Sequence, residues 1–171
     1  MKSIIAFDHA LTAKIRAWGQ PGYVFWKFVA GQSIGFFALA ALAFAYVGQL
    51  NFWHFLIVFT FAYLIANLFQ HLIKRNRPDF ERLTGYKMWI HTYSYPSAHA
   101  TMSAAAATAI CLLPAFSTDT VAVVTIASAV VLAFLIGLSR IVVGVHYLAD
   151  VAFGWLLGFV IALAYVLVIS A

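Results

Sequence analysis

His146 and Asp150 have the residue types and the spacing of a catalytic pair. They stand four residues apart, about one helical turn, so their side chains can meet on one face of a helix. The carboxylate can then accept a hydrogen bond from one ring nitrogen and leave the other nitrogen free to attack. His99, in a separate apolar run, is available to donate a proton to a leaving oxygen.

Cations and a hydroxyl accompany these three residues. Arg77 and Arg140 each offer a planar guanidinium that matches two oxygens of a phosphate group. Ser97 follows Pro96 at the start of an apolar run, which predicts a helix N-cap with free backbone N–H groups that can bind an anion. A nucleophile, its orienting carboxylate, an acid and cations together predict a phosphoryl-transfer site.

The composition of the chain predicts the environment of this site. Hydrophobic residues make up 65% of the 171 residues and charged residues 9%, whereas a soluble globular chain carries about 25% charged residues. The chain is therefore predicted to be an integral membrane protein. No linker or low-complexity run divides it, so residues 1–171 are predicted to form one domain. Cys111, the single cysteine, is interpreted as a small packing residue.

The predicted fold is all-α: a polytopic membrane helical bundle of about five transmembrane helices plus an N-terminal amphipathic interfacial helix. A bilayer core requires about 20 apolar residues, and the runs that fit are 28–47, 53–73, 97–113, 121–138 and 145–169. Residues 1–20 carry apolar side chains at helical spacing, which predicts the interfacial helix; an amphipathic helix packed on the bundle fits equally well. The polar segment 74–96 is predicted to lie on the active-site side.

Spans of alternating direction would bring four helix ends to one membrane face. The polar residues at those ends are Gln70, Lys74, Arg75, Arg77, Ser97, His99, Ser139, Arg140, His146 and Asp150. The opposite face has only Asp119 as a charged side chain. Ionisable groups at membrane depth are costly and mark function, so their convergence predicts a single site.

Three blocks of residues resemble the signature of the type 2 phosphatidic acid phosphatase (PAP2) superfamily. The blocks are Gln70 with Arg77-Pro78, then Pro96-Ser97-Ala98-His99, then Ser139-Arg140 with His146 and Asp150. The third block matches the family pattern without a gap. In the first, glutamine stands in the place of the family's lysine, and in the second, alanine stands in the place of a glycine.

The resemblance implies a helical-bundle lipid phosphatase that works through a phosphohistidine intermediate, without a metal or another cofactor. His146 would be the nucleophile, Asp150 its partner and His99 the general acid. The candidate phosphate-binding residues are Arg77, Arg140, Ser97, Ala98, Lys74, Gln70 and Ser139. Because Gln70 brings no charge, Lys74 is the candidate substitute for the missing lysine. Ala98 fits a helix start unless the backbone there requires a positive φ.

Three alternatives compete with this interpretation. His99, His146 and Asp150 could instead be three zinc ligands with an open position, although clustered arginines repel a cation. A catalytically inactive or transporting relative that binds lipid phosphate is the non-enzymatic alternative, because Gln70 replaces a cation. A vanadate-dependent haloperoxidase shares the phosphate pocket, but those enzymes are soluble.

The remaining polar and aromatic residues are given structural interpretations. The histidines and cations interpreted as packing or interfacial residues are His9, His54, His71, His91, Arg75, Arg82 and Lys87. The aromatic residues interpreted as an interface belt are Tyr86, Trp89, Tyr93 and Tyr95.

The net charge of the chain is +5, and its basic residues stand beside apolar spans rather than on a solvated face. The predicted partners are therefore the lipid bilayer and a membrane lipid phosphate, and no nucleic acid. Family candidates are phosphatidic acid, phosphatidylglycerol phosphate, polyprenyl phosphates or diphosphates, and lipid A phosphates. The expected location is the bacterial cytoplasmic membrane. The excess of Lys and Arg on the site's face favours a site that faces the cytoplasm, whereas related bacterial enzymes mostly face outward.

Overall fold

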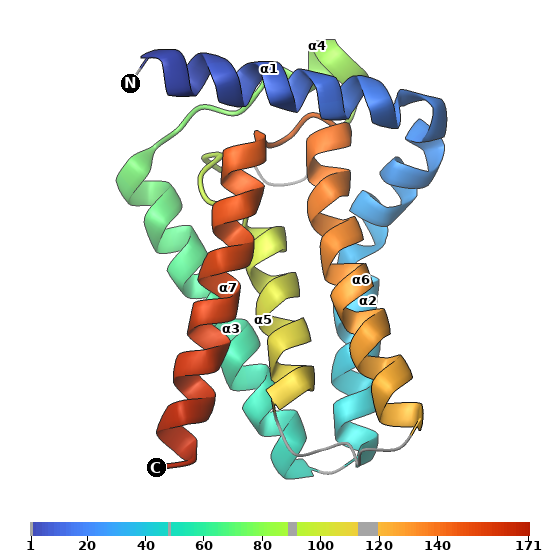
Figure 1. Ribbon diagram of the computed structural model, residues 1–171, viewed down its shortest axis with the longest axis vertical. Helices are drawn as coiled ribbons and strands as arrows, with labels where there is room; N and C mark the ends of the chain where they lie inside the picture. The colour runs from blue at the N-terminus through green and yellow to red at the C-terminus, as the bar shows by residue number, and fades with distance from the viewer. Residues whose placement is uncertain (1, 48, 89–91, 113–119) are drawn as a thin grey trace.

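The computed structural model describes residues 2–47, 49–88, 92–112 and 120–171, and these residues form helices and connections without a strand (Figure 1). The elements in chain order are α1 (Lys2–Gly19), the short 3-10 helix η1 (Gln20–Gly22), α2 (Tyr23–Val47), α3 (Gln49–Ile73), α4 (Phe80–Thr84), α5 (Ala98–Leu112), α6 (Thr120–Val142) and α7 (Leu148–Ile169). The predicted all-α membrane bundle is confirmed. Trp89, His91 and Asp119, which entered the predictions above, lie outside the described residues.

Five helices, α2, α3, α5, α6 and α7, run along the long axis of the bundle (Figure 1). Among the described residues, three segments are long and apolar enough to cross a membrane, namely Phe52–Ile73, Val123–Val142 and Leu148–Ile169. Helix α5 is apolar but shorter. The chain is an integral membrane protein, and the number of five spans stays a prediction.

The last two helices differ from their predicted bounds. Helix α6 continues to Val142, beyond the predicted residue 138, and α7 begins at Leu148 rather than at residue 145. Gly144 has a positive φ of 84°, a conformation that glycine adopts without strain. The chain therefore turns sharply between the two helices, and His146 lies in this turn rather than inside α7.

Two glycines of α7 bring this helix close to α5. A Cβ atom on Gly158 would lie 2.1 Å from the carbonyl oxygen of Thr101, and one on Gly154 would lie 2.9 Å from the carbonyl oxygen of Ser97. Small residues four positions apart allow two membrane helices to approach backbone to backbone. The start of α5 is thereby held against the start of α7, where the catalytic candidates lie.

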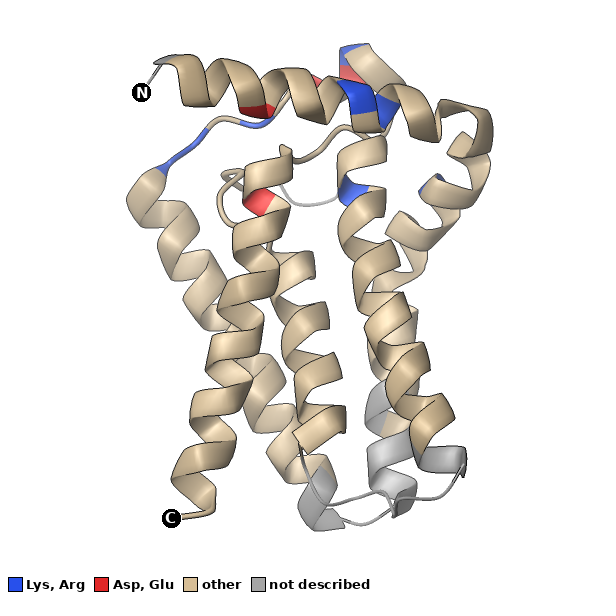
Figure 2. Ribbon diagram, viewed as in Figure 1, with Lys and Arg blue, Asp and Glu red and all other residues tan. Residues whose placement is uncertain are grey.

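Helix α1 lies across one end of the bundle (Figure 1). It packs on α6 and α7 through a polar side on which Asp8 and Thr12 are buried, while Ile4, Phe7 and Trp18 are exposed. Packing on the bundle, one of the two interpretations of residues 1–20, is thus present, and contact with a membrane interface stays a prediction. Figure 2 shows that the charged residues of the described segments gather at this same end.

Candidate active site

The turn between α6 and α7 positions His146. The backbone N–H groups of Val145 and His146 both donate to the carbonyl oxygen of Arg140, at 3.1 and 3.2 Å. His146 is 1% exposed and Arg140 is 3% exposed. The end of α6 and the turn that follows it therefore hold the histidine and the arginine of the third block next to each other in a buried position.

Each nitrogen of the His146 ring faces a different residue. Nε2 accepts a hydrogen bond from Nη1 of Arg77 at 3.0 Å. Nδ1 lies 3.5 Å from Oδ2 of Asp150, longer than a well-formed hydrogen bond. Because Arg77 can only donate, Nε2 must carry the lone pair and Nδ1 the proton that faces Asp150. Burial and the positive charge of Arg77 lower the pKa of His146 to about 4, so the ring is neutral near pH 7.

Asp150 is fully buried, and both of its carboxylate oxygens accept hydrogen bonds. Its Oδ1 accepts from Nη1 of Arg75 at 2.7 Å. Its Oδ2 accepts from the hydroxyl of Ser94 and, at 2.8 Å, from the backbone N–H of Tyr147. A carboxylate with an arginine, a hydroxyl and a helix N-terminal amide as partners is stabilised in its charged form.

Arg77 uses all five of its N–H donors on protein atoms. Nε donates to the carbonyl oxygen of Thr92 and Nη2 to the Thr92 hydroxyl and the carbonyl oxygen of Tyr93, at 2.7 to 3.1 Å. Nη1 donates to the carbonyl oxygen of Val145 as well as to His146. Burial and repulsion by Arg140 lower the pKa of Arg77 to about 10, so it remains a cation at neutral pH. These contacts tie the segment around Thr92 to the nucleophile candidate.

Arg140 is buried without a carboxylate partner among the described residues. Its Nη1 donates to the carbonyl oxygen of Ala30 at 3.3 Å, the guanidinium lies 5.8 Å from the ring centre of Tyr86, and its Nε has no hydrogen-bond partner. A buried cation without a counter-ion is costly. A bound phosphate would supply the missing negative charge.

The start of α5 contributes the second block. The backbone N–H of Ser97 donates to the carbonyl oxygen of Asp150 at 3.0 Å, and the Ser97 hydroxyl lies 3.5 Å from the N–H of Ala100. Ala98 is the first residue of α5 and is partly buried. His99 follows, within electrostatic range of Arg77, Arg140 and His146. The structure therefore brings both histidines and both arginines into one region.

Two of the predicted phosphate-binding residues bond to other protein atoms, and a third is exposed. Nε2 of Gln70 donates to the carbonyl oxygen of Pro96 at 2.8 Å, while its Oε1 is buried without a partner. The Ser139 hydroxyl donates within its own helix to Ile136 at 2.6 Å. Lys74 is exposed and ends α3 with a positive φ of 53°. Gln70 supports the loop before α5, and the structure leaves Lys74 outside the group of buried site residues.

Two residues of the site were given no catalytic or phosphate-binding role from the sequence. Arg75, interpreted above as an interfacial charge, bridges the carboxylates of Asp8 and Asp150 with two contacts of 2.7 Å. Burial lowers the pKa of Arg75. The hydrogen bond to Asp8 and the charge of Asp150 outweigh this effect and raise the pKa above its ordinary value. Ser94 is the second, through its hydroxyl. The available signal was Asp8, the single carboxylate in the sequence of α1.

The described residues contain no group of three His, Cys, Asp or Glu side chains placed to hold a metal ion.

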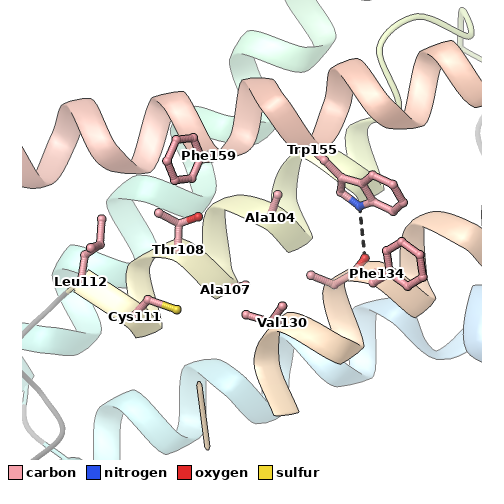
Figure 3. A pocket seen from close by; sticks show the side chains of 10 residues that line it. Ala104, Ala107, Thr108, Cys111, Leu112, Val130, Phe134, Trp155 and Phe159 are labelled. Atoms are coloured by element: carbon pink, nitrogen blue, oxygen red, sulfur yellow. Dashed lines mark hydrogen bonds between the residues drawn. The ribbon is translucent and has the colours of Figure 1, made fainter. Parts of the chain in front are cut away.

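Two cavities lie near the site. One, of about 490 Å³, is lined by polar residues that include His71, Arg75, Arg77 and Thr92. The other, of about 390 Å³, is an apolar groove between α5, α6 and α7, lined by Ala104, Trp155 and Phe159 among others (Figure 3).

The fold and the site together define a membrane helical bundle with a buried group of arginine, histidine and aspartate residues at one end. The model of the PAP2 superfamily matches residues 51–171, and the chain belongs to this family. The match contains all three blocks and leaves α1 and α2 outside it.

Among curated proteins, the chain is similar to decaprenylphosphoryl-5-phosphoribose phosphatase from two strains of Mycobacterium tuberculosis, with 40% identity over 97 residues. The aligned part is 57% of this chain and 49% of that protein. The chain thus spans about half the length of the curated relatives it matches.

Two crystal structures share the fold. One is a transmembrane PAP2-type phosphatidylglycerolphosphate phosphatase from Bacillus subtilis, with a TM-score of 0.72, 20% identity, and coverage of 96% of this chain and 85% of that one. The other is LpxE from Aquifex aeolicus, with a TM-score of 0.73, 21% identity, and coverage of 91% and 92%.

Proposed function

We propose that the protein is an integral membrane phosphatase that hydrolyses the phosphomonoester or diphosphate of a membrane lipid through a phosphohistidine intermediate, without a metal. The observation that carries the proposal is the placement of His146, with Arg77 at Nε2 and Asp150 on the side of Nδ1. This arrangement presents a neutral imidazole lone pair beside a guanidinium that can bind phosphate oxygens.

In the first step, Nε2 of His146 attacks phosphorus and the bond from phosphorus to the lipid oxygen breaks. His99, in the protonated form that the negative charge of the bound phosphate favours, gives a proton to that oxygen as it leaves and becomes neutral. Arg77 exchanges its contact with His146 for a phosphate oxygen, and Arg140 neutralises the phosphate's charge. Asp150 stabilises the positive charge that develops on the His146 ring.

In the second step, a water molecule attacks the phosphorus of phosphohistidine. His99, neutral after the first step, accepts a proton from this water, and the bond between phosphorus and Nε2 breaks. Inorganic phosphate leaves and both histidines return to their starting states. The role of Ser97 and the amide near Ala98 is to hold the transferred group at the N-terminus of α5.

The location of the site supports a lipid substrate. The polar cavity beside Arg77 is of a size for a headgroup, and the apolar groove of Figure 3 begins at Ala104 and Trp155. Each of these residues is five positions along its helix from His99 or Asp150, about 7.5 Å of rise. An acyl or polyprenyl chain in the groove would place its phosphate at the site. Phosphatidic acid, phosphatidylglycerol phosphate and polyprenyl phosphates or diphosphates are the substrates to test.

The test is release of inorganic phosphate from a panel of these lipids by detergent-purified protein, with EDTA present throughout. The His146→Ala variant should lose phosphate release. The control variant His54→Ala should keep it, because His54 lies far along α3 from the site, where its ring contacts the Tyr165 hydroxyl at 2.6 Å. Loss of wild-type activity in EDTA with recovery on zinc would refute the metal-free mechanism. Lipid binding without release from any substrate would instead indicate an inactive or transporting relative.

A further inference from the structure

Helix α1 reaches the catalytic candidates through one carboxylate. Oδ2 of Asp8 accepts from Nη2 of Arg75 at 2.7 Å, and Nη1 of the same guanidinium donates to Oδ1 of Asp150 at 2.7 Å. Asp150 in turn faces Nδ1 of His146. The result is a continuous chain of four side chains from α1 to the nucleophile candidate. Asp8 lies outside residues 51–171, the part of the chain that matches the family.

A second set of contacts fixes the same end of α7 to α1. Oδ1 of Asp8 accepts from the backbone N–H of Ala149 at 2.9 Å, and the Thr12 hydroxyl oxygen accepts from that of Leu148, also at 2.9 Å. The ring of Tyr147 stacks on His9, with ring centres 4.4 Å apart, and the guanidinium of Arg75 lies 4.2 Å from the centre of the Tyr147 ring. Three consecutive residues at the start of α7 thus contact α1.

The charged side chains that link α1 to His146 are largely buried, and burial strengthens the interactions between their charges. The side chain of Asp8 is 11% exposed, that of Arg75 is 23% exposed and that of Asp150 is fully buried. Charges in such surroundings interact more strongly than they would in water. If Asp150 alone faced Arg75, the guanidinium would cancel most of the carboxylate's effect on His146. Asp8 shares the guanidinium and also fixes its orientation by holding its second nitrogen.

We infer that Asp8 is a positioning residue of the active site, which acts through Arg75 to set the place and the effective charge of Asp150 and thereby to support His146. The inference rests on the proposed function, because its effect is measured on phosphate release. It adds α1 to the elements that support the site.

The first test is Asp8→Asn, with kcat and KM measured separately. Asparagine keeps an oxygen that can accept from the N–H of Ala149, but its amide cannot share the positive charge of Arg75. A misplaced catalytic group costs up to about 100-fold in rate, so kcat should fall about tenfold. Because Asp8 is not among the proposed phosphate-binding residues, KM should change by less than about twofold. Asp8→Glu, which keeps the charge, should recover part of kcat.

The coupling is tested by combining variants. In an Asp150→Asn background, the further change Asp8→Asn should alter the residual kcat by less than about twofold, because both act on one chain of contacts. Independent, multiplicative losses would contradict the inference.

Thr12→Val is the matched control for a purely structural effect. This variant removes another α1 contact to the start of α7 while it leaves the charged chain intact. It should lower the melting temperature but keep kcat within about twofold of wild type. Equal losses of kcat in Thr12→Val and Asp8→Asn, or a wild-type kcat in Asp8→Asn, would overturn the inference. In both cases a wild type that releases phosphate and an inactive His146→Ala variant would leave the proposed function standing.

Discussion

Arg77 donates a hydrogen bond to the nitrogen of His146 that is proposed to attack phosphorus, across 3.0 Å. The contact does two things at once. It fixes the ring in the tautomer that leaves a lone pair on Nε2, and it places a cation where the oxygens of an attacked phosphate would lie. A substrate phosphate must take over this contact, and its negative charge makes it a better partner for the guanidinium than a neutral imidazole.

Replacement of Arg77 by lysine tests whether the shape of the guanidinium matters. Lysine keeps the charge but cannot reproduce contacts to Thr92, Tyr93, Val145 and His146 together. We expect kcat/KM for phosphate release to fall about 100-fold, as when one oxyanion donor is removed. The matched control is Arg82→Lys on the exposed side of α4, which should stay within about twofold of wild type. Full activity of Arg77→Lys would show that a point charge is sufficient.

The pH dependence should report the depressed pKa of His146. The pKa is lowered from 6.5 to about 4 by burial and by Arg77, so the neutral, nucleophilic ring persists down to about pH 4. Protonation below that pH removes the lone pair, and kcat/KM should then fall about tenfold per pH unit. Arg77→Gln removes the repelling charge and should move this acid limb to higher pH. A wild-type acid limb near pH 6.5 would mean that the ring is not perturbed in this way.

The close approach of α5 and α7 predicts a large effect of a small substitution. Gly158→Ala places a methyl group 2.1 Å from the carbonyl oxygen of Thr101, so the helices must move apart. Overpacking of this kind costs about 1–3 kcal/mol of stability, and the thermal midpoint in detergent should fall accordingly. Gly31→Ala on α2 is the control, since a Cβ there meets no atom within 4 Å. If both variants melted like wild type, the helices would be able to separate without cost.

The sequence predicted the site where its residues are close in the chain or belong to one of the three blocks. His146 and Asp150 are four residues apart, and their pairing followed from helical spacing even though His146 lies just before α7. The position of Ser97 at the start of a helix was predicted from the proline that precedes it.

The contact of Asp8 with Arg75 could not be predicted in this way. The two residues are 67 positions apart, and their meeting depends on how α1 crosses the end of the bundle. Lys74 and Arg75 are adjacent cations at the end of α3, and composition does not tell which of them turns inward. The backbone decides it: Lys74 takes the left-handed conformation that ends the helix, and Arg75 then extends toward Asp150.

The side of the membrane that the site faces can be determined by labelling. The described basic residues gather at the α1 end of the bundle (Figure 2), and a Lys and Arg excess favours the cytoplasmic side. In a Cys111→Ser background, a cysteine in place of Leu83, which is 52% exposed on α4, should react with a membrane-impermeant maleimide only after the cells are permeabilised. Ser170→Cys, near the C-terminus at the opposite end of the bundle (Figure 1), should react on intact cells. The reverse pattern would place the site on the outer side of the membrane. Its substrate would then have to be a lipid phosphate of the outer leaflet. The basic residues would owe their position to phosphate binding rather than to the topology of the chain.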